Sequence, residues 1–461
     1  MADLSTCLPL TPDSIRQTHA RIEQYIHRTP LITSRTIDKI ASSPDPRAYL
    51  VDDPPSIWDD TSSPAQNGNE KHGQDGLSAP KCNIYFKMEN HQKIGAFKAR
   101  GAFSALTHLV SPPDAELSGI GIEELRKRGV ATHSSGNHAQ ALALAASSLG
   151  VPAWIVMPTI STKSKISGTK GHKGVTVVFS GSTGPEREKV VNEVIAEQKA
   201  KTGGEGPILV PPYDHADIVL GQGTAGYEAE QQYQAMKKTV RICSGAAGDS
   251  NEVANGGARE KEERFDAVLT PLGGGGLLSG TATWFSHTHT SGKKTLVFGC
   301  EPNFEGANDG ERGLASDPPE RITHVKTLTI ADGLRTYVGI VPWSIISDKS
   351  KVEGAFSVSE TEIKMALKLM IERMKVVIEP SSAVPLAVIL FNERFRRFVS
   401  EKQSKEATGT AWDVGVVVSG GNTTVEGLSK LFSEGWNNFD AERQTGEVGL
   451  DGKKVAEDVA G

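Results

Sequence analysis

The sequence has few cysteines, and they are scattered. Cys7, Cys82, Cys243 and Cys300 are the only ones in 461 residues, and no two of them form a CxxC pair. Such thiol usage indicates a reducing compartment, and ordinary packing is the simplest role for each cysteine.

Long hydrophobic runs and clusters of basic residues are also missing. No apolar run approaches membrane-spanning length, and the opening residues, MADLSTCLPLTPD, lack the basic start and apolar core of a secretory signal. The formal net charge is −6, and lysine and arginine do not cluster. We therefore expect a cytoplasmic protein that binds neither nucleic acid nor membrane.

What the sequence does contain is a regular alternation of strand-like and helix-like segments. Strands are predicted at 84–88, 130–134, 153–157, 175–180, 208–210, 267–270, 295–299 and 414–418. Helices are predicted at 137–149, 186–201, 224–234, 278–285, 360–374, 384–398 and 424–432, and a further helix starts at Thr11-Pro12. Because strands separated by helices form right-handed βαβ units, the alternation predicts an α/β protein with parallel sheets covered on both faces.

Three polar stretches interrupt this pattern. Residues 42–80 are rich in Pro, Ser, Asp, Gly and Asn and follow neither a helical nor a strand period. This composition cannot bury enough apolar surface to offset the entropy of ordering, so 42–80 is predicted to be a long, mobile surface insertion. Residues 111–121 and 244–263 are similar, and we expect all three to be loops that decorate the fold.

Lys98 stands at a corner between a predicted strand and a helix. It follows a Gly-Ala-Phe turn in the segment HQKIGAFKARGAFSA. A lysine packed at such a corner loses hydration, so its pKa falls and its amine becomes a usable base or Schiff-base nucleophile. The alternative is an ordinary solvated lysine.

Three further polar or glycine-rich corners follow predicted strands. Gly273–Gly276 precede a helix and suit a phosphate, although a tight βα turn would use the same residues. The corner Ser134–His138 offers hydroxyls and free helix N–H groups to a carboxylate, or is simply a helix cap. Ser419 opens the third corner, SGGN. In open α/β sheets, ligands bind beyond the carboxyl ends of strands, where all of these residues lie.

An amine, a phosphate cradle, a carboxylate cradle and a strand-end hydroxyl together match pyridoxal phosphate. The segments that carry them resemble, in order, those of the fold-type II pyridoxal-phosphate enzymes. Within these, the chain is similar to the eukaryotic serine racemase and serine/threonine dehydratase group, which includes fungal threo-3-hydroxyaspartate ammonia-lyases. The segments are KMENHQKIGAFKARGA, HSSGNHAQALA, PPYDH with GQGT, LGGGGLLSG, TIADGLRT, ERMKVVIEP and VVVSGGN.

The resemblance implies a fold like the tryptophan synthase β subunit, with two open, twisted, mostly parallel sheets flanked by helices. A large cofactor-binding domain would comprise 1–125 and 223–461, and a small domain would comprise 126–222. The resemblance also implies a homodimer that acts on a small amino acid.

The resemblance assigns roles to individual residues. Lys98 would hold the cofactor as an internal aldimine, and Ser135 would be a second catalytic base on the opposite face. The other cofactor-binding residues would be Asn137, Gly273, Gly274, Gly275, Gly276, Leu277 and Ser419. Substrate contacts would come from Ser134, His138, Arg187 and Thr336, with an exposed helix charge as the alternative reading of Arg187.

A divalent-cation site is implied as well. Glu301 and Asp309 would supply carboxylates and Ala307 a backbone carbonyl, an oxygen set that suits magnesium or calcium. The interval between the carboxylates is longer than the family pattern because of the segment 303–306. An ATP effector is implied too, with Lys93 as the nominated position.

These implications lead to a serine racemase with serine/threonine dehydratase (ammonia-lyase) activity that proceeds through an aldimine and α-proton abstraction. The alternatives are a threo-3-hydroxyaspartate ammonia-lyase and a β-replacement enzyme of the same fold. A binding protein that kept the fold and lost activity is a third alternative.

Overall fold

The computed structural model describes residues 7–51, 78–113, 115, 117–134, 136–243, 263–287, 292, 294–406 and 410–433. The chain divides into two units, Met1–Asn422 and Thr423–Gly461. The described part of the second unit contains one helix, α15 (Val425–Ser433), which matches the helix predicted at 424–432. All elements discussed below belong to the first unit.

The larger sheet has six strands in the order β1-β2-β10-β7-β8-β9. All neighbours are parallel except β1, which runs antiparallel to β2. β10, the final strand of the described chain, lies inside the sheet between β2 and β7. The strands are β1 (Leu31–Thr33), β2 (Cys82–Met88), β7 (Ala267–Pro271), β8 (Leu296–Pro302), β9 (Gly354–Val358) and β10 (Trp412–Val418).

The smaller sheet has four parallel strands in the order β5-β4-β3-β6. They are β3 (Val130–His133), β4 (Ala153–Pro158), β5 (Val175–Ser180) and β6 (Ile208–Leu209). The predicted α/β class with two open, mostly parallel sheets is therefore confirmed.

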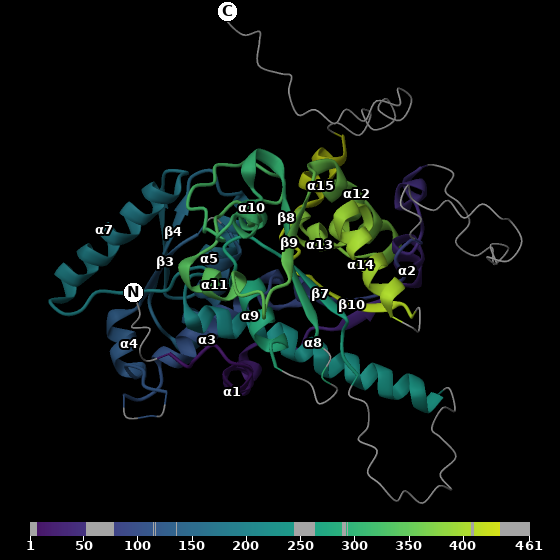
Figure 1. Ribbon diagram of the computed structural model, residues 1–461. Coiled ribbons are helices and arrows are strands. Elements are labelled where there is room, and N and C mark those ends of the chain that lie inside the picture. The colour runs from purple at the N-terminus through teal and green to yellow at the C-terminus, as the bar shows by residue number, and fades with distance from the viewer. Residues whose placement is uncertain are drawn as a thin grey trace, which may run out of the picture. The chain divides into compact units, whose positions relative to one another are not determined.

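Helices pack against both sheets. α7 lies beside β3 and β4, whereas α13 packs on β7, β8 and β10 (Figure 1). The helices of the first unit are α1 (Pro12–Ile22), α2 (Arg35–Ala41), α3 (Lys98–Leu109), α4 (Ile122–Arg128), α5 (Asn137–Leu149), α6 (Lys163–Lys170), α7 (Gly184–Thr202), α8 (Ala216–Cys243), α9 (Gly276–Phe285), α10 (Asp309–Ala315), α11 (Ile340–Ile346), α12 (Glu360–Met374), α13 (Pro380–Phe391) and α14 (Glu393–Lys405). None of the described helices is both long and apolar enough to cross a membrane.

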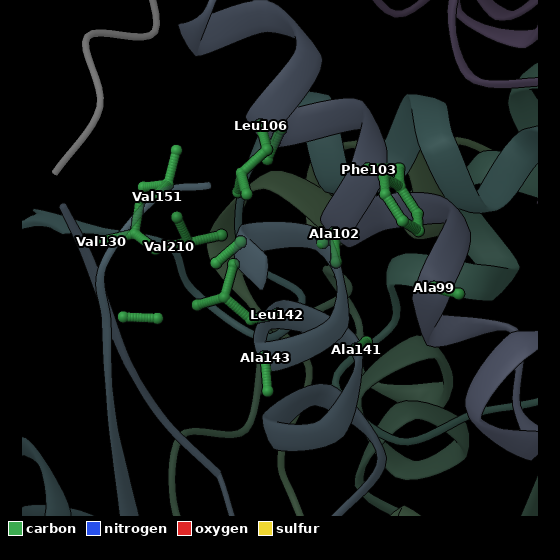
Figure 2. Close-up of a cluster of buried hydrophobic side chains, with 14 of the residues drawn as sticks. Ala99, Ala102, Phe103, Leu106, Val130, Ala141, Leu142, Ala143, Val151 and Val210 are labelled. Carbon is green, nitrogen blue, oxygen red and sulfur yellow. The ribbon is translucent and has the colours of Figure 1, made fainter. Parts of the chain in front are cut away.

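The core beside the smaller sheet explains how α3 and α5 reach their positions. Leu106 of α3 and Leu142 of α5 are fully buried in one cluster with Val130 of β3 (Figure 2). Burying a leucine of this kind stabilises the fold by about 1.5–3 kcal/mol relative to leaving it exposed. Alanines fill most of the remaining buried positions of α5, so the helix packs closely and its first residue is held at a fixed place.

Two helix predictions need correction. The helix predicted at 384–398 is two helices, because Asn392 leaves the helical conformation and caps the second with its side-chain oxygen, which accepts from the Phe395 N–H at 2.9 Å. The helix predicted at 224–234 extends over the whole of α8. Its glycines concealed the continuity, since glycine lowers intrinsic helix propensity.

The prediction that residues 42–80 are a mobile surface insertion is wrong for residues 46–50. Residues Pro46–Leu50 form a 3₁₀ helix capped by Asp45, and Leu50 is buried, so this part belongs to the folded body. Residues 52–77 of that prediction lie outside the described residues, as do 244–262 of the predicted 244–263 loop.

Candidate active site

A cavity of about 140 Å³ lies at the carboxyl ends of the parallel strands. It collects residues from both sheets, which are far apart in sequence. Among the lining residues are nearly all the predicted cofactor and substrate positions: Lys98, Ser134, Asn137, His138, Arg187, Gly273, Gly274, Gly275, Gly276, Leu277, Thr336 and Ser419. Ser135 lies outside the described residues.

Lys98 begins α3 directly after a strained turn. Ile94 and Gly95 have φ of 58° and 70°, and a side chain at Gly95 would come within 2.8 Å of the Asn422 amide oxygen. This turn aims the chain back at the sheet, where the Phe97 N–H donates to the Ser419 carbonyl at 3.0 Å. The main chain therefore fixes the lysine corner against the end of β10.

The Lys98 ammonium is largely removed from water. Its Nζ donates to the Pro212 carbonyl at 2.8 Å and lies 5.1 Å from the centre of the Phe97 ring. Burial lowers its pKa to about 8, and the nearby Glu379 carboxylate opposes that shift only in part. With this pKa, roughly a tenth of the amine is neutral at pH 7, far more than for an ordinary lysine, and the neutral form is the one that a base or nucleophile requires.

The glycine loop leaves space that side chains would fill. Gly275 has φ of +89°, and a Cβ at Gly274 would come within 2.3 Å of the Tyr213 ring. α9 begins at Gly276, so its first backbone N–H groups lack partners within the helix. Free amides at a helix N-terminus, without side chains in the way, fit a phosphate.

Asn137 and His138 open α5 at the predicted carboxylate corner. The Asn137 amide donates to Glu379 Oε1 at 3.0 Å, while its oxygen accepts from the Asn422 amide at 2.8 Å. His138 donates from Nε2 to the Val210 carbonyl at 3.3 Å, and burial lowers its pKa to about 3. His138 is therefore neutral throughout the working range of an enzyme.

Ser134 and Ser419 lie at the ends of β3 and β10. The Ser134 hydroxyl accepts from the Gly136 N–H, which shapes the turn into α5. Ser419 lies 3.0 Å from the Ser382 hydroxyl, and Ser382 in turn accepts from the Gly420 N–H. The Ser419 hydroxyl, which lines the cavity, is therefore held by a second buried serine at this strand end.

Arg187 and Thr336 line the cavity and are partly buried. Arg187 donates to the Ser182 carbonyl at 2.7 Å, and burial lowers its pKa. It is therefore not the freely exposed helix charge that was the alternative reading.

Glu379, Lys165 and Asp332 also line the cavity, and sequence reasoning missed all three. Glu379 is buried, and its pKa rises to about 7 because of burial and the negative charge of Asp332, while Lys165 opposes the rise. Lys165 pairs with Asp332 at 2.5 Å, which joins α6 to the segment 332–334. Glu379 and Asp332 sit inside ERMKVVIEP and TIADGLRT, so the motifs contained a signal for both.

Glu301 and Asp309 are both buried. Glu301 accepts from the N–H groups of Gly310 and Glu311, and Asp309 accepts from that of Val338. Burial and the negative charge of Asp309 hold the Glu301 pKa well above its usual range, and burial raises the Asp309 pKa to about 6. Ala307, two residues before Asp309, is also buried, and its N–H donates to the Phe304 carbonyl. Two buried carboxylates that repel each other fit a divalent cation, which would relieve the repulsion.

Comparison with known proteins gives concordant results. A family model for pyridoxal-phosphate dependent enzymes matches residues 74–420. A serine racemase of Dictyostelium discoideum is 34% identical over 424 residues, covering 92% of this chain and 98% of that one. A crystal structure of serine racemase from Dictyostelium discoideum superposes with a TM-score of 0.62, covering 90% of this chain and 99% of that one at 33% identity. An L-threo-3-hydroxyaspartate ammonia-lyase of Saccharomyces cerevisiae is 32% identical over 415 residues, covering 90% and 93%.

Proposed function

The chain belongs to the pyridoxal-phosphate dependent enzyme family, and from that premise we propose that it is a serine racemase with serine/threonine ammonia-lyase activity. The observation that carries the proposal is that the Lys98 amine, the glycine loop and the Ser419 hydroxyl all line one cavity. The test is a product assay on L-serine, D-serine, L-threonine and threo-3-hydroxyaspartate that scores keto acid and enantiomer together.

The residues of this cavity fit pyridoxal phosphate. Lys98 would bond its aldehyde, Gly273–Gly276 with Leu277 would hold its phosphate, Asn137 would contact the ring oxygen and Ser419 the ring nitrogen. When bound, the cofactor supplies an electron-withdrawing ring that stabilises negative charge on the substrate α-carbon. Because the Ser419 hydroxyl does not enforce a charged ring, well-placed bases carry more of the work.

The two proposed bases explain how one site supports two outcomes. The neutral Lys98 amine would take the α-proton from one face of the substrate, and Ser135 would serve the other. Removal of the α-proton from one face and its return to the other inverts the configuration of the α-carbon. Removal of the proton followed by loss of the β-hydroxyl as water yields an enamine, and hydrolysis of its imine form by a second water molecule gives a keto acid and ammonia. The substrate carboxylate would lie at Ser134 and the N-terminus of α5, where free N–H groups attract an anion.

A threo-3-hydroxyaspartate ammonia-lyase is the second candidate. Arg187 favours it, since this cation lines the cavity and could pair with a second substrate carboxylate. The yeast relative supports the same reading. A β-replacement enzyme is less favoured, because the buried Glu301 and Asp309 pair belongs to the racemase and lyase pattern.

We also propose that the four-stranded sheet forms a small domain of residues 126–222 beside a large domain. A homodimer and an ATP effector at Lys93 rest on the resemblance, a cytoplasmic location rests on composition, and all three stay predictions.

The lowered Lys98 pKa predicts how pH controls cofactor uptake. An amine bonds an aldehyde only when neutral, and the neutral fraction of Lys98 grows as pH rises through about 8. We therefore expect the rate of cofactor incorporation into cofactor-free protein to rise about tenfold per pH unit below that value and then level off. Stopped-flow absorbance measures this rate. A rate that keeps rising toward the ordinary lysine pKa of 10.5 would contradict the burial argument.

Magnesium or calcium is expected to stabilise the protein through Glu301, Asp309 and the Ala307 carbonyl. An ion that binds only the folded state adds about 2.7 kcal/mol to the free energy of unfolding at a hundredfold excess over its Kd. Chelation with EDTA should therefore lower both the melting temperature and the rate. Adding Mg²⁺ or Ca²⁺ back to the chelated protein should restore the melting temperature, Glu301→Gln should remove this response to Mg²⁺ or Ca²⁺, and the exposed Glu320→Gln should keep it. An unchanged melting temperature after chelation would show that the site is absent.

A further inference from the structure

A second group of ligand side chains lies outside the cavity. It consists of Cys7, His215 and Asp217, each of which offers one ligand atom within 4.8 Å of the other two. In the described part of the chain, no other set of three His, Cys, Asp or Glu side chains meets this criterion. Sequence analysis gave Cys7 only a packing role, because its partners are more than two hundred positions away.

The sulfur and the imidazole have the spacing of two ligands on one ion. Cys7 Sγ lies 4.0 Å from His215 Nε2. In a tetrahedral zinc site, bonds of about 2.3 Å to sulfur and about 2.0 Å to nitrogen put these atoms about 3.5 Å apart. A small inward movement of the partly exposed Cys7 side chain is enough to close the difference.

Asp217 has one carboxylate oxygen that accepts no hydrogen bond from the described residues. Its side chain is 3% exposed, and Oδ2 accepts from His108 Nδ1 at 2.7 Å. Oδ2 lies 3.6 Å from His215 Nδ1, the ring nitrogen that accepts from the Asp217 N–H and does not face Cys7. Oδ1 is buried and makes no hydrogen bond to any described residue. Arg21 is the nearby cation, but its Nε donates to Thr107. An unpaired buried carboxylate oxygen is costly, and a bound cation removes that cost.

From this geometry we propose that Cys7, His215 and Asp217 bind a zinc ion. A thiolate, an imidazole and a carboxylate form a borderline-soft set that suits zinc and does not suit magnesium or calcium, which prefer oxygen alone. Three protein ligands leave a fourth position for water. Cys7 is partly exposed, so the ion has a path to the site.

Zinc bound to His215 would stabilise the turn at 212–215, which lies beside the cavity. His215 follows Pro212 and Tyr213, and these two residues line the cavity. The Pro212 carbonyl is the acceptor for Lys98 Nζ. On its other side the turn is held by Asp214, which accepts from the N–H groups of Ile340 and Val341. The ion would thus tie the N-terminal segment to the turn that positions the lysine.

Cobalt substitution tests the site in the full-length, cofactor-loaded protein. After chelation, titration with Co²⁺ is expected to give the visible bands of tetrahedral cobalt at one ion per chain, at longer wavelength than the cofactor, and Zn²⁺ should displace them. Cys7→Ser should lose the bands and bind zinc at least about tenfold more weakly. Cys82→Ser, which changes a buried thiol in β2, should retain both.

Asp217→Asn is a second variant. It replaces the carboxylate that accepts from His108 Nδ1 with an amide, and its melting curve shows whether the protein still folds. Zinc should raise the melting temperature of the wild-type protein and of Glu301→Gln, but not that of Cys7→Ser. Absence of tetrahedral bands in the wild-type protein, or their persistence in Cys7→Ser, would overturn the proposal. Neither result depends on racemase or lyase turnover, so the zinc site and the proposed function fail independently.

Discussion

Lys98→Ala is expected to lose both the visible absorbance of bound cofactor and catalytic turnover. Burial lowers the pKa of Lys98, which lines the cavity, to about 8. The proposal gives this lysine two roles, as the residue that bonds the cofactor and as a catalytic base. Removing a general base alone commonly costs about 10²–10⁴-fold in rate, and loss of the covalent link adds to that. Absorbance, borohydride trapping followed by peptide mapping, and pyruvate release from L-serine measure the effect.

Lys165→Ala is the matched control, because Lys165 lines the same cavity. Its ammonium pairs with Asp332, whose charge holds the pKa above the ordinary value despite burial, so it is a poor nucleophile. The Lys165 variant should therefore remain yellow. Trapped cofactor on any lysine in Lys98→Ala would show that the amine has been assigned to the wrong residue. A wild-type protein whose colour does not change with L-serine would favour the reading of an inactive binding protein.

Ser135→Ala is expected to separate the two reactions. D-serine presents its α-proton to the face assigned to Ser135, so its elimination should fall by about 10²–10⁴-fold. Racemisation should fall by a similar factor because it needs both faces. Elimination from L-serine needs only Lys98 and should fall by no more than about a hundredfold, the effect of a misplaced contact.

Ser134→Ala provides the comparison at the same corner. Ser134 is assigned to the substrate carboxylate, which both enantiomers share, so its loss should weaken turnover of L- and D-serine alike. Pyruvate from each enantiomer, and D-serine formed from L-serine, are measured in both variants and in the wild-type protein. Equal losses for the two enantiomers in Ser135→Ala would make Ser135 a carboxylate contact, and the two-base mechanism would have to be abandoned.

The sequence predicted the parts of the site that depend on local chain geometry. Lys98 follows a turn that needs the positive φ of Gly95, and a Cβ at Gly274 or Gly275 would come within 2.3 or 2.7 Å of a neighbouring side chain. Requirements of this kind act between near neighbours, so they leave motifs in the sequence. The same holds for most strands, whose buried apolar runs are visible without any knowledge of the fold.

The parts that escaped prediction depend on contacts between distant segments. Glu379 becomes a group with a pKa of about 7 because the fold buries it near the negative charge of Asp332, and the hydrogen bond from Asn137 opposes this rise only in part. Lys165 has no local feature that distinguishes it from a surface lysine until α6 meets Asp332. The break at Asn392 was also hidden, since an asparagine in an otherwise helical pattern is a weak signal beside the apolar residues around it.

The central place of β10 in the larger sheet has a consequence for biosynthesis. Among the described strands this one is made last. It pairs with β2 over residues 412–418 and with β7 over residues 414–416. Until residues 412–418 leave the ribosome, β2 and β7 each expose an unpaired edge, and such edges recruit other chains. The link between Phe97 and Ser419 is likewise missing, so the nascent chain cannot hold its lysine corner in place. Completion of the sheet and assembly of the catalytic cavity should therefore be a single late event, and chaperone demand should peak just before it.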